Sequence, residues 1–100
     1  MTASAPAQPL IAIADVSWRE RARVRGRVRS LRVQPWAGTP TVECVVLDDT
    51  GGLVAIFLGR RWIAGIQPGT VLTLEGMVGE HNGRPAIINP DFELVANGAP

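Results

Sequence analysis

The chain has 100 residues, of which 46% are hydrophobic and 19% are charged. These proportions exclude an intrinsically disordered chain, and the length suffices for one domain with one hydrophobic core. The formal net charge of +1 hides a strong asymmetry, since residues 19–32 hold seven of the ten arginines and a single acid, Glu20. Arginine supplies every basic side chain besides the one histidine, which fits either a codon bias or selection for bidentate phosphate contacts.

The N-terminal part of the chain predicts a cytoplasmic protein. It has no basic segment before a signal-peptide core, and no apolar run approaches the roughly 20 residues of a membrane span. The single cysteine, Cys44, lies in an apolar run and is interpreted as a buried small hydrophobe in a reducing compartment. We therefore expect no membrane partner.

Residues 1–9 are small, polar and proline-rich, which predicts a mobile tail before a single domain over residues 10–96. Residues 10–18 carry apolar side chains that fit either a short helical turn or an extended segment packed on the core.

The first predicted strand covers residues 21–33. From Arg19 to Arg29 every odd position is arginine, while the even positions from 22 to 28 are small or apolar, which indicates one cationic and one buried face. The apolar phase changes at Arg29 and Ser30, so a β-bulge is expected there. Gly26 permits strong curvature.

The remaining elements are short strands separated by turn signals. A loop is predicted over 34–40, strands over 41–47, 53–58 and 70–78, an irregular connector over 59–69, a hairpin turn at 82–83, a fifth strand from 86, and an extended return over 92–95. This order predicts an all-β fold, a small five-stranded Greek-key barrel of the OB type, with a short irregular or helical connector between strands three and four.

Three segments carry a family resemblance. Residues 24–28 (VRGRV), 47–53 (LDDTGGL) and 69–78 (GTVLTLEGMV) resemble successive strands of OB-fold nucleic-acid-binding domains. The subtype resembles the wedge domain of RecG-type helicases and the anticodon-binding OB folds, and residues 88–93 (INPDFE) are similar to the last strand of the wedge domain. As a free-standing domain the chain most resembles small actinobacterial OB-fold proteins. The resemblance implies contact with single-stranded or branched nucleic acid.

Catalytic chemistry has little support in the sequence. The only histidine, His81, lies at a predicted hairpin tip and is interpreted as a solvated turn residue. Cys44 has no neighbouring base or second thiolate, and Asp48 and Asp49 fit a turn better than a metal site. We therefore predict that the chain is not an enzyme and has no catalytic residue, metal site or cofactor.

The cationic face of the first strand predicts a polyanion site. Strand parity directs Val42, Cys44 and Val46 inward, and by the resemblance also Leu53, Ala55 and Phe57. The alternative is a solvated, edge-protecting stripe that Glu43 neutralises in part. The predicted nucleic-acid-binding residues are Arg23, Arg25, Arg27, Arg29, Arg32, Trp36, Arg60, Arg61 and Arg84.

The aromatic residues divide between stacking and packing. Trp36, in the predicted loop beside Arg32, is the candidate for base stacking, against simple loop packing. Trp62 is expected to anchor the connector, with ligand contact as the alternative, and Phe57 is expected to be buried.

A second hypothesis is a protein-interaction or self-assembly module. It uses an apolar patch on the outer face of strands two and three, formed by Val45, Val54, Ile56 and Leu58, as a homo-oligomer contact. A third is an accessory domain whose partner protein supplies an enzymatic activity.

Overall fold

The computed structural model describes residues 8–96. Residues 1–7 of the predicted tail lie outside this part, so the division into tail and domain stays a prediction. The described chain forms a short 3-10 helix and six strands: η1 (Ile13–Asp15), β1 (Arg21–Trp36), β2 (Thr39–Leu47), β3 (Gly52–Leu58), β4 (Val71–His81), β5 (Arg84–Ile88) and β6 (Asp91–Leu94). None of the helices in residues 8–96 is long and apolar enough to cross a membrane.

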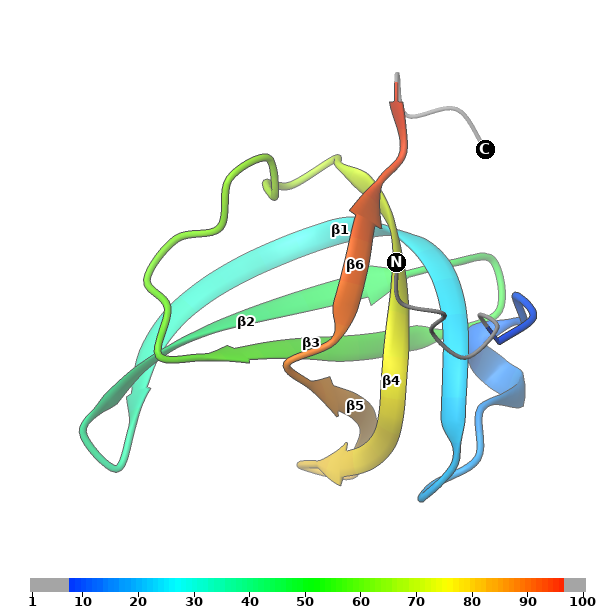
Figure 1. Ribbon diagram of the computed structural model, residues 1–100, viewed down its shortest axis with the longest axis horizontal. Coiled ribbons are helices and arrows are strands. Elements are labelled where there is room, and N and C mark those ends of the chain that lie inside the picture. Colours follow the sequence, from blue (N-terminus) through cyan, green and yellow to red (C-terminus); the bar gives the residue numbers. More distant parts are fainter. Residues whose placement is uncertain (1–7, 97–100) are drawn as a thin grey trace, which may run out of the picture.

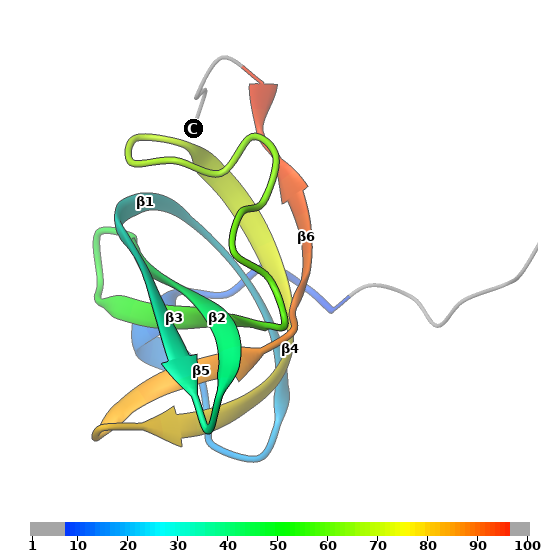
Figure 2. The ribbon, with the colours of Figure 1, turned by 90° about the vertical axis from the view of Figure 1, so that its left-hand side faces the viewer.

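The strands close into a barrel because β1 serves two neighbours. Its first half pairs with β4 from Arg21 to Arg27, and its second half pairs with β2 from Arg27 to Trp36. Figures 1 and 2 show the bend that turns this long strand from one partner to the other. With β3 beside β2, and β5 parallel to β3 and antiparallel to β4, the ring runs β1-β2-β3-β5-β4 and returns to β1. The all-β five-stranded barrel predicted from the sequence is confirmed, and β6 adds to the edge of β4.

The bend in β1 has two local causes that the sequence indicated. A register shift between Val28 and Ser30 confirms the predicted bulge. At Gly26, a Cβ atom would lie 2.6 Å from the carbonyl oxygen of Leu47 and 2.7 Å from a methyl of Val46. Only glycine therefore allows β1 to pass so close to the end of β2.

The barrel core follows the predicted parity. Val24 and Val28 of β1 and the inward-facing residues of β2 and β3 belong to one buried cluster. These inward-facing residues are Val42, Cys44, Val46, Leu53, Ala55 and Phe57. From η1, Ile13 adds a buried side chain to the same cluster.

The first hairpin is tighter than predicted. The expected loop over 34–40 is wrong, because β1 continues to Trp36 and β2 begins at Thr39. Ala37 and Gly38 alone form the turn, with φ of 48° and 83°. Two successive left-handed residues are the geometry of a two-residue hairpin turn, which alanine adopts less readily than glycine. Asn82 and Gly83 form the second such turn, as predicted, with φ of 54° and 80°.

The connector between β3 and β4 is irregular and contains no helix. Two isoleucines, Ile63 and Ile66, are 4% and 5% exposed and attach it to the core.

Candidate nucleic-acid interface

The arginines of the first half of β1 lie on the outer face of the barrel. Ala22, Val24, Gly26 and Val28 are buried, so the alternate positions point outward, as predicted. The neighbours on this face are the outward residues of β4, since Arg23 pairs with Glu75 and Arg25 pairs with Thr73. The strand next to β4 contributes Glu93, the partner of Thr73 on β6.

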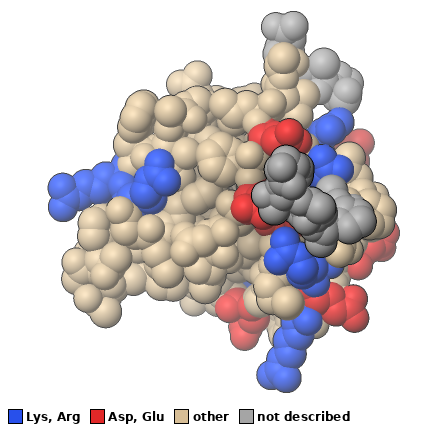
Figure 3. Space-filling view, in the orientation of Figure 1, with Lys and Arg blue, Asp and Glu red and all other residues tan. Residues whose placement is uncertain are grey.

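Two of these arginines are paired with acids inside the chain. Arg21 lies 3.5 Å from Glu75, and Arg23 lies 3.9 Å from Glu75 and 3.6 Å from Glu93. Figure 3 shows the consequence, with blue and red side chains interleaved on the right-hand side of the molecule and a separate blue group at its left-hand edge. Arg21 and Arg23 are therefore compensated in part by acids of their own sheet.

In the part of the chain that the structure describes, the later arginines of the row have no acidic partner. The Nε atom of Arg25 donates to the Thr73 hydroxyl at 3.1 Å, and a terminal nitrogen of Arg27 donates to the Gly69 carbonyl at 2.8 Å. Both partners are neutral, so these contacts orient the guanidinium groups without compensating them. Within residues 8–96, no ion pair forms with Arg25, Arg27, Arg29, Arg32, Arg60, Arg61 or Arg84.

An apolar groove of about 340 Å³ opens on the outer side of β3, β4 and β5. Its lining includes the Trp36 and His81 rings, which stack with centroids 5.1 Å apart and an interplanar angle of 22°. The other lining residues are Ile56, Met77, Gly79, Glu80, Ala86 and Ile88. An apolar hollow with a flat aromatic wall is suited to a planar, partly apolar group such as a nucleobase.

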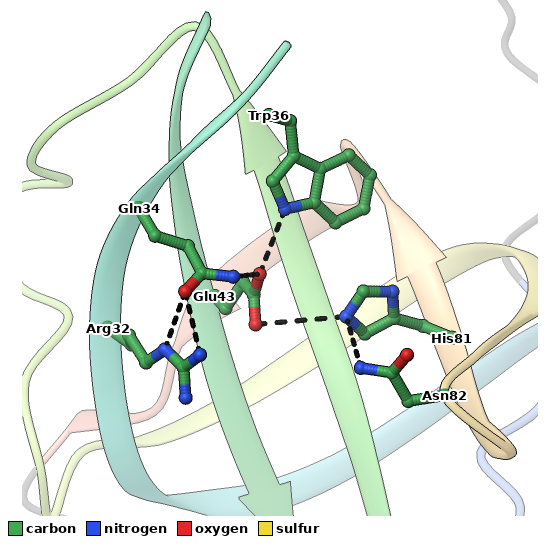
Figure 4. Close-up of polar contacts among 6 residues, drawn as sticks. All are labelled: Arg32, Gln34, Trp36, Glu43, His81 and Asn82. Atoms are coloured by element: carbon green, nitrogen blue, oxygen red, sulfur yellow. Dashed lines mark hydrogen bonds and ion pairs between the residues drawn. The ribbon is translucent and has the colours of Figure 1, made fainter. Parts of the chain in front are cut away.

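Glu43 on β2 holds this aromatic wall in place (Figure 4). Its carboxylate accepts hydrogen bonds from Trp36 Nε1 at 3.0 Å and from Gln34 Nε2 at 3.1 Å, and the other oxygen lies 3.8 Å from His81 Nε2. Arg32 donates two hydrogen bonds, of 2.9 and 2.7 Å, to the Gln34 side-chain oxygen. The amide of Gln34 therefore stands between Arg32 and Glu43, and the expected direct neutralisation of an arginine by Glu43 does not occur.

The bulge explains why these residues share one face. Before it, the odd positions of β1 point outward; after it, Arg32 pairs with Glu43 and the even positions take the outer side. The one-residue shift brings Arg32, Gln34 and Trp36 together over β2. Arg84 is the β5 partner of His81, so it lies on the same face of the sheet as this histidine.

The structure corrects the expectation for His81. It is not a freely solvated turn residue, because its side chain is 23% exposed and stacks on Trp36. The contact joins the β1–β2 hairpin to the β4–β5 hairpin. Because the two residues are far apart in the sequence, no local pattern could predict it. Trp36 itself is the last residue of β1, where it packs on a small cluster of buried apolar side chains.

The predicted apolar patch on strands two and three is also corrected. Val54 and Ile56 do face outward, but they are 5% and 1% exposed. They pack with Ala86 of β5, and Trp36 lies against them. Val45 is half-buried, which leaves Leu58 as the exposed member of the set.

The surroundings of Cys44 and Asp48 shift the pKa of each side chain. Burial raises the pKa of the Cys44 thiol to about 11, so the reactive thiolate is disfavoured at neutral pH. For Asp48, burial opposes the charged form, but hydrogen bonds from the Thr50 hydroxyl and from the amides of Ile13, Thr50 and Gly51 outweigh it and lower its pKa. In residues 8–96, no group of three or more His, Cys, Asp or Glu side chains is arranged to hold a metal ion.

The closed ring in this strand order, with a bent first strand shared by two neighbours, is an OB fold. Solved structures share it. The OB domain of Ta0387 from Thermoplasma acidophilum matches with a TM-score of 0.70 at 20% identity, over 91% of each chain. The replication factor A related protein from Methanobacterium thermoautotrophicum matches with a TM-score of 0.66 at 19% identity, over 91% of this chain and 94% of that one.

A structure of yeast Stn1 and Ten1 matches with a TM-score of 0.61 at 12% identity, over 77% of this chain and 43% of that one. At these identities the likeness establishes the fold. No protein-family model and no curated protein matches the chain.

Proposed function

We propose that this chain is a non-catalytic module that binds single-stranded or branched nucleic acid. The observation that carries the proposal is the aromatic groove beside uncompensated arginines. A base would enter the groove against the Trp36–His81 pair, while Arg32, bonded to Gln34, and Arg84, the strand partner of His81, hold phosphates. OB folds bind oligonucleotides on the outer surface of their second and third strands.

The arginines of β1 extend the phosphate contacts away from the groove. Arg25, Arg27 and Arg29 are the expected contributors, because their charges are not paired within the described residues. Arg23 contributes less than the sequence predicted, since Glu75 and Glu93 already face it. One of the solved structures with this fold is named as a replication factor A related protein, which agrees with the proposal.

The test is a fluorescence-anisotropy panel with single-stranded DNA, single-stranded RNA, duplex and fork substrates, at two salt concentrations. If the five arginines named above contact phosphate, log K against log salt should have a slope of about −3.5 on single strands. The double variant Arg25→Ala/Arg27→Ala should weaken binding and flatten this slope. The proposal would be overturned if none of the substrates bound, or if the affinity for all of them did not depend on salt.

The fork substrate addresses the finer resemblance. Preference for the fork over a single strand of equal length would support the likeness to RecG-type wedge domains, which stays a prediction. Light scattering over a dilution series addresses self-assembly. A tight dimer that ignores every oligonucleotide would favour the interaction module, although burial of Val54 and Ile56 removes the patch on which that hypothesis was based.

A further inference from the structure

Trp62 is the most exposed of the large hydrophobic side chains described, at 73%. The sequence predicts that it anchors the connector, and the structure contradicts this prediction. Ile63 and Ile66 are the buried anchors instead, and the backbone amide of Ile66 donates to the Ile63 carbonyl at 3.1 Å. The indole therefore projects into solvent from a segment that is fixed beside it.

Two unpaired cations precede this indole in the chain. Arg60 and Arg61 are both exposed, and neither forms an ion pair with any residue from 8 to 96. A single exposed apolar residue requires no explanation. An exposed indole directly after two uncompensated guanidinium groups is different, because it combines a base-stacking surface with two phosphate ligands.

The connector starts beside the first hairpin. The Gly59 amide donates to the Pro40 carbonyl of β2 at 2.7 Å. Arg61 lines a shallow hollow of about 240 Å³, and the other lining residues all belong to the β1–β2 hairpin: Val33, Gln34, Pro35, Gly38 and Pro40. The same hairpin carries Trp36, which lines the aromatic groove. By strand parity, Val33 and Pro35 face the opposite side of the hairpin from Trp36, so a strand that leaves the groove would pass around the hairpin to reach the connector.

We propose that Arg60, Arg61 and Trp62 form a second contact for single-stranded nucleic acid, which extends the site from the groove around the first hairpin to the connector. This inference rests on the proposed function. Trp62 stacks on a base and the two arginines hold the adjacent phosphates. The bound strand therefore contacts two separate tryptophans.

Fluorine NMR of the chain labelled with 5-fluorotryptophan tests the inference. The three tryptophan resonances are assigned with single Trp→Phe variants and then followed during titration with a 15-nucleotide oligothymidylate. Trp36 and Trp62 should both shift with the same saturation curve. Trp18 is the internal control, because it is 54% exposed but lines neither the groove nor the hairpin hollow.

The outcomes separate the two proposals. A shift of Trp36 without Trp62 overturns the second contact and leaves the proposed function standing. No shift and no anisotropy change with any nucleic acid overturns both. A Trp62 shift that appears with phosphatidylglycerol vesicles but not with the oligonucleotide also overturns the inference, because the connector would then be a membrane-surface contact.

Substitutions measure how much the second contact contributes to the affinity for the oligonucleotide. Trp62→Ala should weaken binding of the 15-nucleotide strand by about 5- to 150-fold, and Trp62→Phe should restore much of that loss. Arg60→Gln/Arg61→Gln should lower the salt slope by about 1.4. Because all three side chains are exposed, the melting temperature should not change. Trp18→Ala is the matched control and should leave the affinity unaltered.

Discussion

The carboxylate of Glu43 accepts a hydrogen bond from the indole of Trp36 at 3.0 Å, so an acid on β2 sets the orientation of the ring at the end of β1. The same carboxylate lies 3.8 Å from the imidazole that stacks on this ring. An acid within a proposed phosphate-binding surface is thus used internally, to fix an aromatic wall before any ligand arrives. Such preorganisation reduces the ordering cost of binding.

Trp36→Ala should weaken binding of single-stranded oligonucleotides by about 5- to 150-fold, since stacking of one base contributes roughly 1–3 kcal/mol. Fluorescence anisotropy at constant salt measures the change. Trp18→Ala, which removes an exposed indole outside the groove, should leave the affinity unaltered. Equal affinities of the wild type and Trp36→Ala would place the ligand elsewhere on the barrel.

Arg27→Gln and Arg23→Gln should differ although both remove one positive charge from the same face of β1. Arg27 bonds only to a neutral carbonyl, so its loss should lower the salt slope by about 0.7. Arg23 already faces Glu75 and Glu93, so its loss should change the slope little. Salt titrations of both variants on one oligonucleotide provide the comparison, and identical slopes would contradict the division of the arginine row.

Asp48→Asn should destabilise the fold by about 1–3 kcal/mol, because hydrogen bonds to a charged acceptor are lost in the turn between β2 and β3. The pKa of Asp48 is lowered in the folded state. Its stabilising contribution is therefore complete above the unfolded value near 3.8 and is lost as the pH falls through the lower folded value. Urea unfolding from pH 7 to pH 2 should show this acid-dependent loss in the wild type and a smaller one in Asp48→Asn.

Gly26→Ala should destabilise the barrel by about 1–3 kcal/mol, since the added methyl group would overlap the Leu47 carbonyl and a Val46 methyl. Gly79→Ala is the matched control, because the nearest atom to its new Cβ, the Ala86 carbonyl oxygen, lies 4.0 Å away. Thermal unfolding compares the two variants. A Gly26→Ala protein as stable as Gly79→Ala would show that β1 can move away from β2 at little cost.

Local pattern was sufficient for most of the fold. The alternation from Arg21 to Val28, the phase change at Ser30 and the Asn82–Gly83 turn each depend on neighbours in the chain, so strand, bulge and turn were all predictable. The first hairpin turn was missed because Ala37 adopts a positive φ that alanine does not signal. Trp62 was misplaced for a related reason, since apolar character says that a residue can be buried but not which of several neighbours fills the core.

What the sequence by itself determined is the alternation that makes β1 cationic on one face, together with the order of strands that closes the barrel. What only the tertiary structure decided is which arginines remain uncompensated and where the aromatic groove lies. Both depend on pairs that are distant in the chain. Glu75 on β4 and Glu93 on β6 approach Arg23 on β1, and His81 of the second hairpin stacks on Trp36 of the first. Charge neutralisation and ring stacking are set by separations of a few ångströms, which barrel closure creates between segments that have no local relation.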